Sequence, residues 1–122
     1  MPAAFLNPYI LVLVGGALGS LLRYYAAVFL GARPATTFCV NITGSFSIGL
    51  LAAVADDPRI RLLLGTGVLG GFTTFSAWQL EALQAARLEG GSRAAVLILF
   101  GSLAAGFLAC WIGYYFGEKW KH

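Results

Sequence analysis

Four long apolar runs alternate with short polar breaks along the chain. The runs cover residues 9–30, 36–55, 62–88 and 94–117. The second run ends at Asp56, Asp57 and Pro58, where two acids and a proline favour a helix end in water. Because a membrane-spanning helix needs roughly 20 mainly apolar residues, each run predicts one span. The first run has no Lys or Arg before it, so it lacks the basic region of a secretory signal and is expected to be a span.

The composition supports the same fold class. Of the 122 residues, 59% are hydrophobic and 11% are charged, whereas about 25% of an ordinary globular domain is charged. We therefore predict an all-α integral membrane protein, in which residues 1–122 form a single transmembrane domain of four helices. The cell membrane is its expected location.

Most charged residues lie between the apolar runs or near their ends. The net charge is +3, but the basic residues form no stripe, so no nucleic-acid partner is predicted. With four spans both termini share one side, which holds four basic residues against four on the other. The first group is Arg59, Arg61, Lys119 and Lys121, and the second is Arg23, Arg33, Arg87 and Arg93. This balance favours neither insertion direction and predicts an antiparallel, dual-topology homodimer, unless other signals fix one orientation or a sister chain is the partner.

Small residues recur at four-residue spacing in every span. The pairs are Gly15 and Gly19, Ser45 and Gly49, Gly67 and Gly71, Ser102 and Gly106, and Gly113 and Gly117. Such pairs allow helix backbones to approach closely in lipid, so close helix packing is expected.

The third span is expected to break. It contains Gly70 and Gly71 followed by Thr73, Thr74 and Ser76. A break at membrane depth frees carbonyls that must be buried or line a polar cavity, and such hard oxygen atoms suit a small cation. The alternative is a kinked helix whose hydroxyl groups bond back to the preceding turn.

Further polar residues interrupt the spans. Thr37, Asn41 and Ser45 recur every four residues on one helix face. Asn41 marks either an ion pathway or an interhelical contact. Arg23 interrupts the first apolar run, and Glu81 lies toward the end of the third. An Arg or Glu near a helix end can extend its charged group to water.

The sequence lacks the groups that several functions need. The first span contains no carboxylate, no span contains a pair of acids, and the single histidine is His122. Proton-coupled transport and hydrolytic catalysis are therefore not predicted, and the protein is not expected to be an enzyme. Amides, hydroxyls, backbone groups and ring edges remain, and these can replace the hydration shell of a small ion.

Three motifs resemble a known family. GGFTTFSAW, from Gly70 to Trp78, is similar to the GGFTTFSTF signature of the fluoride channels called Fluc or CrcB, and the agreement extends to Glu81. VNITGSF, from Val40 to Phe46, resembles that family's VNxxGSF, and GGALGSLLRYY, from Gly15 to Tyr25, resembles its GGxxGxxxRY.

The resemblance implies a passive fluoride-selective channel that exports fluoride from the cytoplasm as an antiparallel dimer. It also implies a structural sodium ion held by the backbone carbonyls of Gly70 and Thr73, with Arg23 and Glu81 as vestibule or structural charges. The implied anion pathway consists of Asn41, Phe75, Trp78, Ser102, Thr37 and Ser76.

Some positions depart from the family pattern. Trp78 replaces a phenylalanine, and Ile98 stands where a tyrosine is usual. The indole N–H of Trp78 offers a further hydrogen bond to the ion, or its bulk narrows the path.

Two other functions compete with this interpretation. A small dual-topology multidrug or guanidinium exporter shares the four spans and the antiparallel dimer, but it needs an acid in the first span. A non-transporting subunit of a membrane complex would not explain the polar third span.

Overall fold

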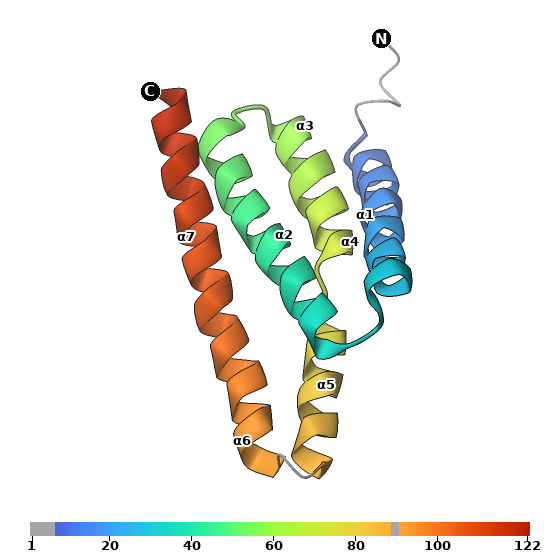
Figure 1. The fold of residues 1–122 in the computed structure, drawn as a ribbon. Helices are drawn as coiled ribbons and strands as arrows, with labels where there is room; N and C mark the ends of the chain where they lie inside the picture. Colours follow the sequence, from blue (N-terminus) through green and yellow to red (C-terminus); the bar gives the residue numbers. More distant parts are fainter. Residues whose placement is uncertain (1–6, 89–90) are drawn as a thin grey trace.

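The computed structural model describes residues 7–88 and 91–122. Four helical segments in these ranges have the length and hydropathy needed to cross a membrane, and no strand occurs in them. The segments are Pro8–Leu30, Pro34–Val54, Pro58–Arg87 and Gly91–Lys121, and they correspond one to one with the predicted spans. Helix α1 begins, and the last helix ends, at the same end of the bundle (Figure 1).

The first two spans are single helices, α1 (Pro8–Leu30) and α2 (Pro34–Val54). Each begins with a proline in its first turn, where the missing N–H would have no intrahelical partner anyway. Gly31 follows α1 with φ at +91°, in a region of backbone conformation that favours glycine. The chain therefore turns within three residues from α1 into α2.

The third and fourth spans are composite helices. The third contains α3 (Pro58–Ile60), the π-helical segment η2 (Arg61–Leu69), α4 (Gly70–Phe72) and α5 (Phe75–Arg87). The fourth contains α6 (Gly91–Val96), the π-helical segment η3 (Leu97–Gly101) and α7 (Ser102–Lys121). In Figure 1 the ribbon of the third span is interrupted between α4 and α5.

The break in the third span falls at the threonines that follow the glycine pair. Gly70 and Gly71 are helical, whereas Thr73 and Thr74 are extended, with ψ at 156° and 121°. A Cβ atom at Gly71 would lie 2.6 Å from the carbonyl oxygen of Gly16 in α1. Gly71 is therefore needed for close helix packing, and the threonines interrupt the helix.

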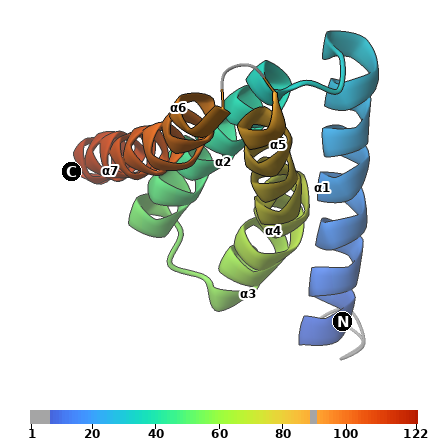
Figure 2. The same ribbon diagram turned by 90° about the horizontal axis from the view of Figure 1, so that it is seen from below.

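The spans pack in two close pairs. Helix α1 lies along η2 and α4, and α2 lies along α7 (Figure 2). A Cβ atom at Gly19 would collide with the Val68 carbonyl in the first pair, and one at Gly49 with the Cys110 carbonyl in the second. The predicted packing through small residues is confirmed for these pairs.

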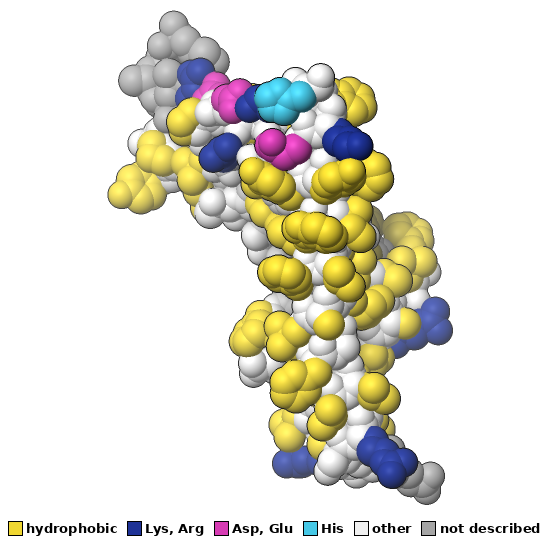
Figure 3. Space-filling view, turned by 90° about the vertical axis from the view of Figure 1, so that its left-hand side faces the viewer, with side chains coloured by type: hydrophobic (Ala, Val, Ile, Leu, Met, Phe, Trp, Pro, Cys, Tyr) yellow, Lys and Arg dark blue, Asp and Glu magenta, His cyan; other side chains and the backbone are white. Residues whose placement is uncertain are grey.

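The outer surface suits a lipid environment. Figure 3 shows apolar side chains along the length of α7 and charged ones at the two ends. Among the described residues the buried apolar side chains are small or medium-sized: Val40, Ala53, Ala55 and Ala82. Large side chains such as Leu97 and Phe100, 72% and 65% exposed, point outward, as expected where lipid or another chain covers them.

Charged residues join the span ends. Lys121 Nζ lies 2.8 Å from Asp56 Oδ1 and connects the end of α7 to the loop after α2. This hydrogen bond and the positive charge of Lys121 lower the pKa of Asp56. The Arg61 guanidinium donates to the carbonyls of Ala55 and Ala52, at 2.6 and 3.1 Å, and so satisfies groups that the end of α2 leaves open.

Candidate ion-conduction site

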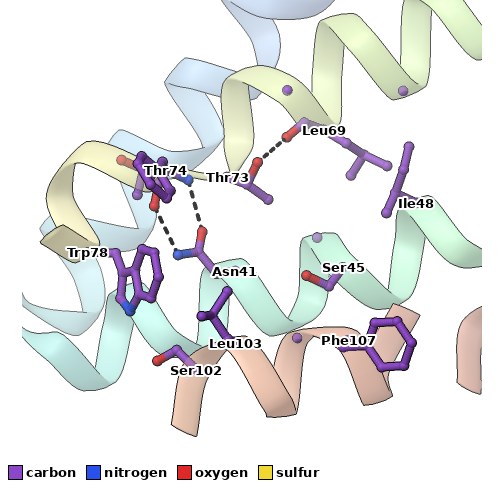
Figure 4. A pocket seen from close by; sticks show the side chains of 15 residues that line it. Asn41, Ser45, Ile48, Leu69, Thr73, Thr74, Trp78, Ser102, Leu103 and Phe107 are labelled. Carbon is purple, nitrogen blue, oxygen red and sulfur yellow. Dashed lines mark hydrogen bonds between the residues drawn. The ribbon is translucent and has the colours of Figure 1, made fainter. Parts of the chain in front are cut away.

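Asn41 bridges the break in the third span. The Thr74 N–H, whose partner in a continuous helix would be the Gly70 carbonyl, instead donates to Asn41 Oδ1 at 2.9 Å. Asn41 Nδ2 donates in turn to the Thr74 carbonyl at 3.0 Å (Figure 4). The side-chain amide of α2 thus satisfies two backbone groups that would otherwise be exposed at membrane depth.

A second N–H is diverted just beyond the break. The Ala77 N–H, which would bond to the Thr73 carbonyl in a continuous helix, donates to Thr74 Oγ1 at 3.3 Å. Thr74 is therefore the N-cap of α5. The carbonyls of Gly70 and Thr73 have both lost their helical N–H partners and are available to another donor or to a cation.

The Thr73 hydroxyl bonds back to the preceding turn. Its Oγ1 donates to the Leu69 carbonyl at 2.9 Å, the interaction expected of a kinked helix. The span is therefore broken, as the first interpretation expects, and one hydroxyl also bonds back to the preceding turn, as the alternative expects.

Arg23 extends from α1 to the break. Its Nε donates to the Gly71 carbonyl at 3.1 Å, replacing the Phe75 N–H that would bond there in a continuous helix. The side chain is half-buried, so Arg23 stabilises the interrupted backbone and does not simply extend to water.

A cavity of about 530 Å³ lies beside the break, between α2, the third span and the start of α7 (Figure 4). It is lined by six of the predicted site residues: Asn41, Gly70, Thr73, Phe75, Trp78 and Ser102. The sequence interpretation did not name Leu103 and Phe107 of its lining. Leu103 lies three residues before Gly106 and four before Phe107, so these residues share one side of α7, and this spacing was the available signal.

Two aromatic rings stand at this cavity. The ring centroids of Phe75 and Trp78 are 5.2 Å apart, with 57° between the ring planes. The Trp78 indole Nε1 donates to the Ile98 carbonyl at 2.9 Å. The expectation that this N–H is free for an ion is therefore wrong in this structure, because the fourth span accepts it.

A second cavity of about 410 Å³ lies between α1, α2 and α5. Arg23, Thr37 and Glu81 line it, and Thr37 Oγ1 donates to Glu81 Oε1 at 2.5 Å. The structure therefore places Thr37 at this second cavity and outside the lining of the one that Asn41 lines, although Thr74 lines both. Polar groups thus extend from Glu81 past the break to Ser102.

Ser76 is separate from these groups. It is exposed on α5 and lies outside the lining of either cavity. Nor do the described residues contain a group of three or more His, Cys, Asp or Glu that would hold a metal ion.

These features define a class of protein. The chain has four helices able to span a membrane, and polar side chains join the break in the third. Amide, hydroxyl and aromatic groups line the cavity beside that break. This combination is that of a multi-pass membrane protein with a polar site among its helices. Residues 10–114 match the family described as CrcB-like protein, Camphor Resistance (CrcB). This chain belongs to that family.

Relatives in several bacteria cover almost the whole chain. A protein of Acidobacterium capsulatum named fluoride-specific ion channel FluC is 44% identical over 91% of this chain and 96% of its own length. One of Gloeobacter violaceus with the same name is 45% identical over 86% and 91%. A third, from Thermus thermophilus and also of that name, is 47% identical over 89% and 92%.

Proposed function

We propose that this protein is a passive, fluoride-selective channel that lets fluoride leave the cytoplasm and so protects the cell from its toxicity. The observation that carries the proposal is the cavity at the break. There Asn41, Phe75, Trp78 and Ser102 converge, in a chain 44–47% identical to relatives named fluoride-specific ion channels. The activity is conduction, and no reaction is catalysed.

The lining suits a small, hard and strongly hydrated anion. An asparagine amide has two N–H donors, of which Asn41 gives one to Thr74 and retains one for an ion. The Ser102 hydroxyl provides another donor, and the edges of aromatic rings carry partial positive charge. Such close donors replace the hydration of fluoride better than that of a larger anion.

The driving force requires no coupled ion. Fluoride enters cells as neutral hydrogen fluoride and dissociates inside. A negative interior then drives each anion outward by about 2.3 kcal/mol per 100 mV. The first span, α1, contains no carboxylate for proton exchange, which argues for a passive pore over a proton-coupled exporter.

The functional unit in this proposal is an antiparallel homodimer in the cell membrane. Because Arg23 reaches the break, it no longer counts among the basic residues at the span ends. The side with both termini then has four basic residues and the other side has three. This near balance still favours neither insertion direction. In the single chain Phe75 is 66% exposed, and Gly70 beside it on the cavity lining is also exposed. A second, inverted copy would cover both.

A structural sodium ion completes the proposal. The carbonyls of Gly70 and Thr73 fit this role, because their helical N–H partners donate to Asn41 and to Thr74 Oγ1. The ion would supply positive charge that stabilises these oxygens at membrane depth. Anomalous scattering from crystals in which a heavier monovalent cation replaces sodium would test this assignment, and density away from both carbonyls would contradict it.

The test is fluoride efflux from liposomes that contain only this protein. With potassium fluoride inside and valinomycin to balance charge, a fluoride electrode should record rapid release that is absent from protein-free vesicles. Release of chloride from matched vesicles should be much slower. Equal rates for the two anions, or no fluoride release, would contradict the proposal.

A further inference from the structure

We infer that Trp78 is a positioning residue whose indole N–H, bound to the Ile98 carbonyl, holds the ring in place beside Ser102 and thereby sets anion selectivity. The functional part of this inference rests on the proposed fluoride conduction. The structural part stands on its own contacts.

The contact joins two spans at the cavity. Trp78 lies on α5, and its Nε1 is 2.9 Å from the carbonyl oxygen of Ile98 in η3. The N–H of Ser102 donates to the same carbonyl and to that of Leu99. One oxygen atom therefore links the ring of Trp78 to the backbone of Ser102, and both residues line the cavity.

The Ile98 carbonyl accepts the indole in addition to its helical partner. In a regular α-helix the Ser102 N–H would donate to Ile98 alone, whereas here it is shared between two carbonyls. A carbonyl oxygen has two lone pairs, so that of Ile98 accepts the indole as well. Single π-helical turns occur frequently at functional sites, and this one is held in place from another span.

The hydrogen bond decides which part of the indole an ion can meet. Because the N–H points to Ile98, the ring presents its carbon edge and its face to the cavity. Phe75 fixes the other side, with its centroid 5.2 Å from that of Trp78. Held between a hydrogen bond and a neighbouring ring, Trp78 cannot move aside easily, so the space beside Ser102 stays narrow and favours a small anion.

The structural part is tested on the parent protein by NMR of its three tryptophans labelled with ¹⁵N at the indole. The Trp78 indole proton should exchange with solvent much more slowly than that of Trp120, whose residue is 86% exposed. It should also resonate at a shift typical of a hydrogen-bonded indole. Exchange as fast as that of Trp120 would overturn the inference.

The functional part is tested by removing only the N–H. Trp78→3-benzothienylalanine keeps the bicyclic shape and replaces the donor by sulfur, whereas Trp78→Phe changes size as well. The matched control is the same replacement at Trp111, 61% exposed on α7. We expect the benzothienylalanine variant to lower the fluoride-to-chloride flux ratio by about two- to tenfold, the effect of losing one neutral hydrogen bond. The Trp111 control and Trp78→Phe, which restores the residue of the family signature, should keep the parent ratio.

The two proposals fail differently. An unchanged ratio in the benzothienylalanine variant would overturn the role of the hydrogen bond in selectivity. A parent that conducts no fluoride would instead overturn the proposed function, and the exchange rate of the Trp78 indole would still decide whether the contact exists.

Discussion

Asn41 and Thr74 form a reciprocal pair of hydrogen bonds across 33 residues of chain. Nδ2 of Asn41 donates to the Thr74 carbonyl at 3.0 Å, and the Thr74 N–H donates to Oδ1 at 2.9 Å. An asparagine side chain matches a backbone amide, because both carry one carbonyl and N–H donors in one plane. Asn41 therefore takes the place of the next helical turn and keeps the third span open at this point.

Replacing Asn41 by Asp should abolish or strongly reduce fluoride efflux from liposomes. A carboxylate cannot donate to the Thr74 carbonyl, and it adds negative charge where an anion passes. The unpaired carbonyl alone should cost about 1–3 kcal/mol of stability, seen as a lower unfolding temperature in detergent. Thr43→Val, on the exposed side of the same helix, is the control and should behave as the parent. Parent-like efflux from Asn41→Asp would show that this amide is not on the path.

Two glycines of α1 should differ sharply when replaced by alanine. A Cβ at Gly19 would collide with the Val68 carbonyl, whereas one at Gly16 would meet nothing within 4 Å. Gly19→Ala should destabilise the protein by about 1–3 kcal/mol through overpacking. Gly16→Ala should be neutral or slightly stabilising, since alanine favours the helix. Equal unfolding temperatures for the two variants would contradict the close packing of α1 on η2.

Phe75→Ile should reduce fluoride efflux with little change in stability. Phe75 lines the cavity and is 66% exposed in the single chain, so an aliphatic side chain removes the positive ring edge and little buried area. Phe116→Ile, in the exposed apolar belt of α7, provides the control. At equal unfolding temperatures, Phe75→Ile should release fluoride more slowly than Phe116→Ile. Equal efflux from the two variants would contradict a role for the Phe75 ring.

The ion pair between Asp56 and Lys121 should give a small pH dependence of stability. The pKa of Asp56 is lowered by the hydrogen bond from Lys121, so the stabilisation is present above the ordinary value of 3.8 and is lost as the pH falls through the lowered value. The parent should therefore unfold at a slightly higher temperature than Asp56→Asn near neutral pH. This difference should shrink as the pH falls below 3.8 and disappear once the pH is below the lowered pKa of Asp56. A difference independent of pH would contradict the pairing.

The spans were predictable because lipid imposes a simple rule on the sequence. Each must be apolar for about 20 residues, and charged residues such as Asp56 and Asp57 end the runs. The break was predicted in the correct span, but Thr73 and Thr74 interrupt the helix, whereas the glycines before them stay helical. Glycine signals helix interruption by its low propensity, yet here Gly71 serves the contact with Gly16. Whether a glycine interrupts its helix or allows close helix packing depends on the neighbouring helix, which the local sequence does not describe.

The site was partly predictable for the same reason. Asn41, Phe75, Trp78 and Ser102 meet at one cavity, as the motifs imply. The contacts from Thr37 to Glu81 and from Trp78 to Ile98 join residues 44 and 20 positions apart. They depend on how the spans rotate against each other, which the sequence pattern within one span does not determine.

The central claim is that this protein alone forms a passive pore selective for fluoride. Its most direct test is the reversal potential of the purified protein in a planar bilayer, measured under separate gradients of fluoride, chloride and protons. A tenfold fluoride gradient should shift the reversal potential by about 59 mV towards the fluoride equilibrium, and the chloride and proton gradients should leave it unchanged. A potential that follows chloride or protons, or the absence of fluoride current, would contradict the account.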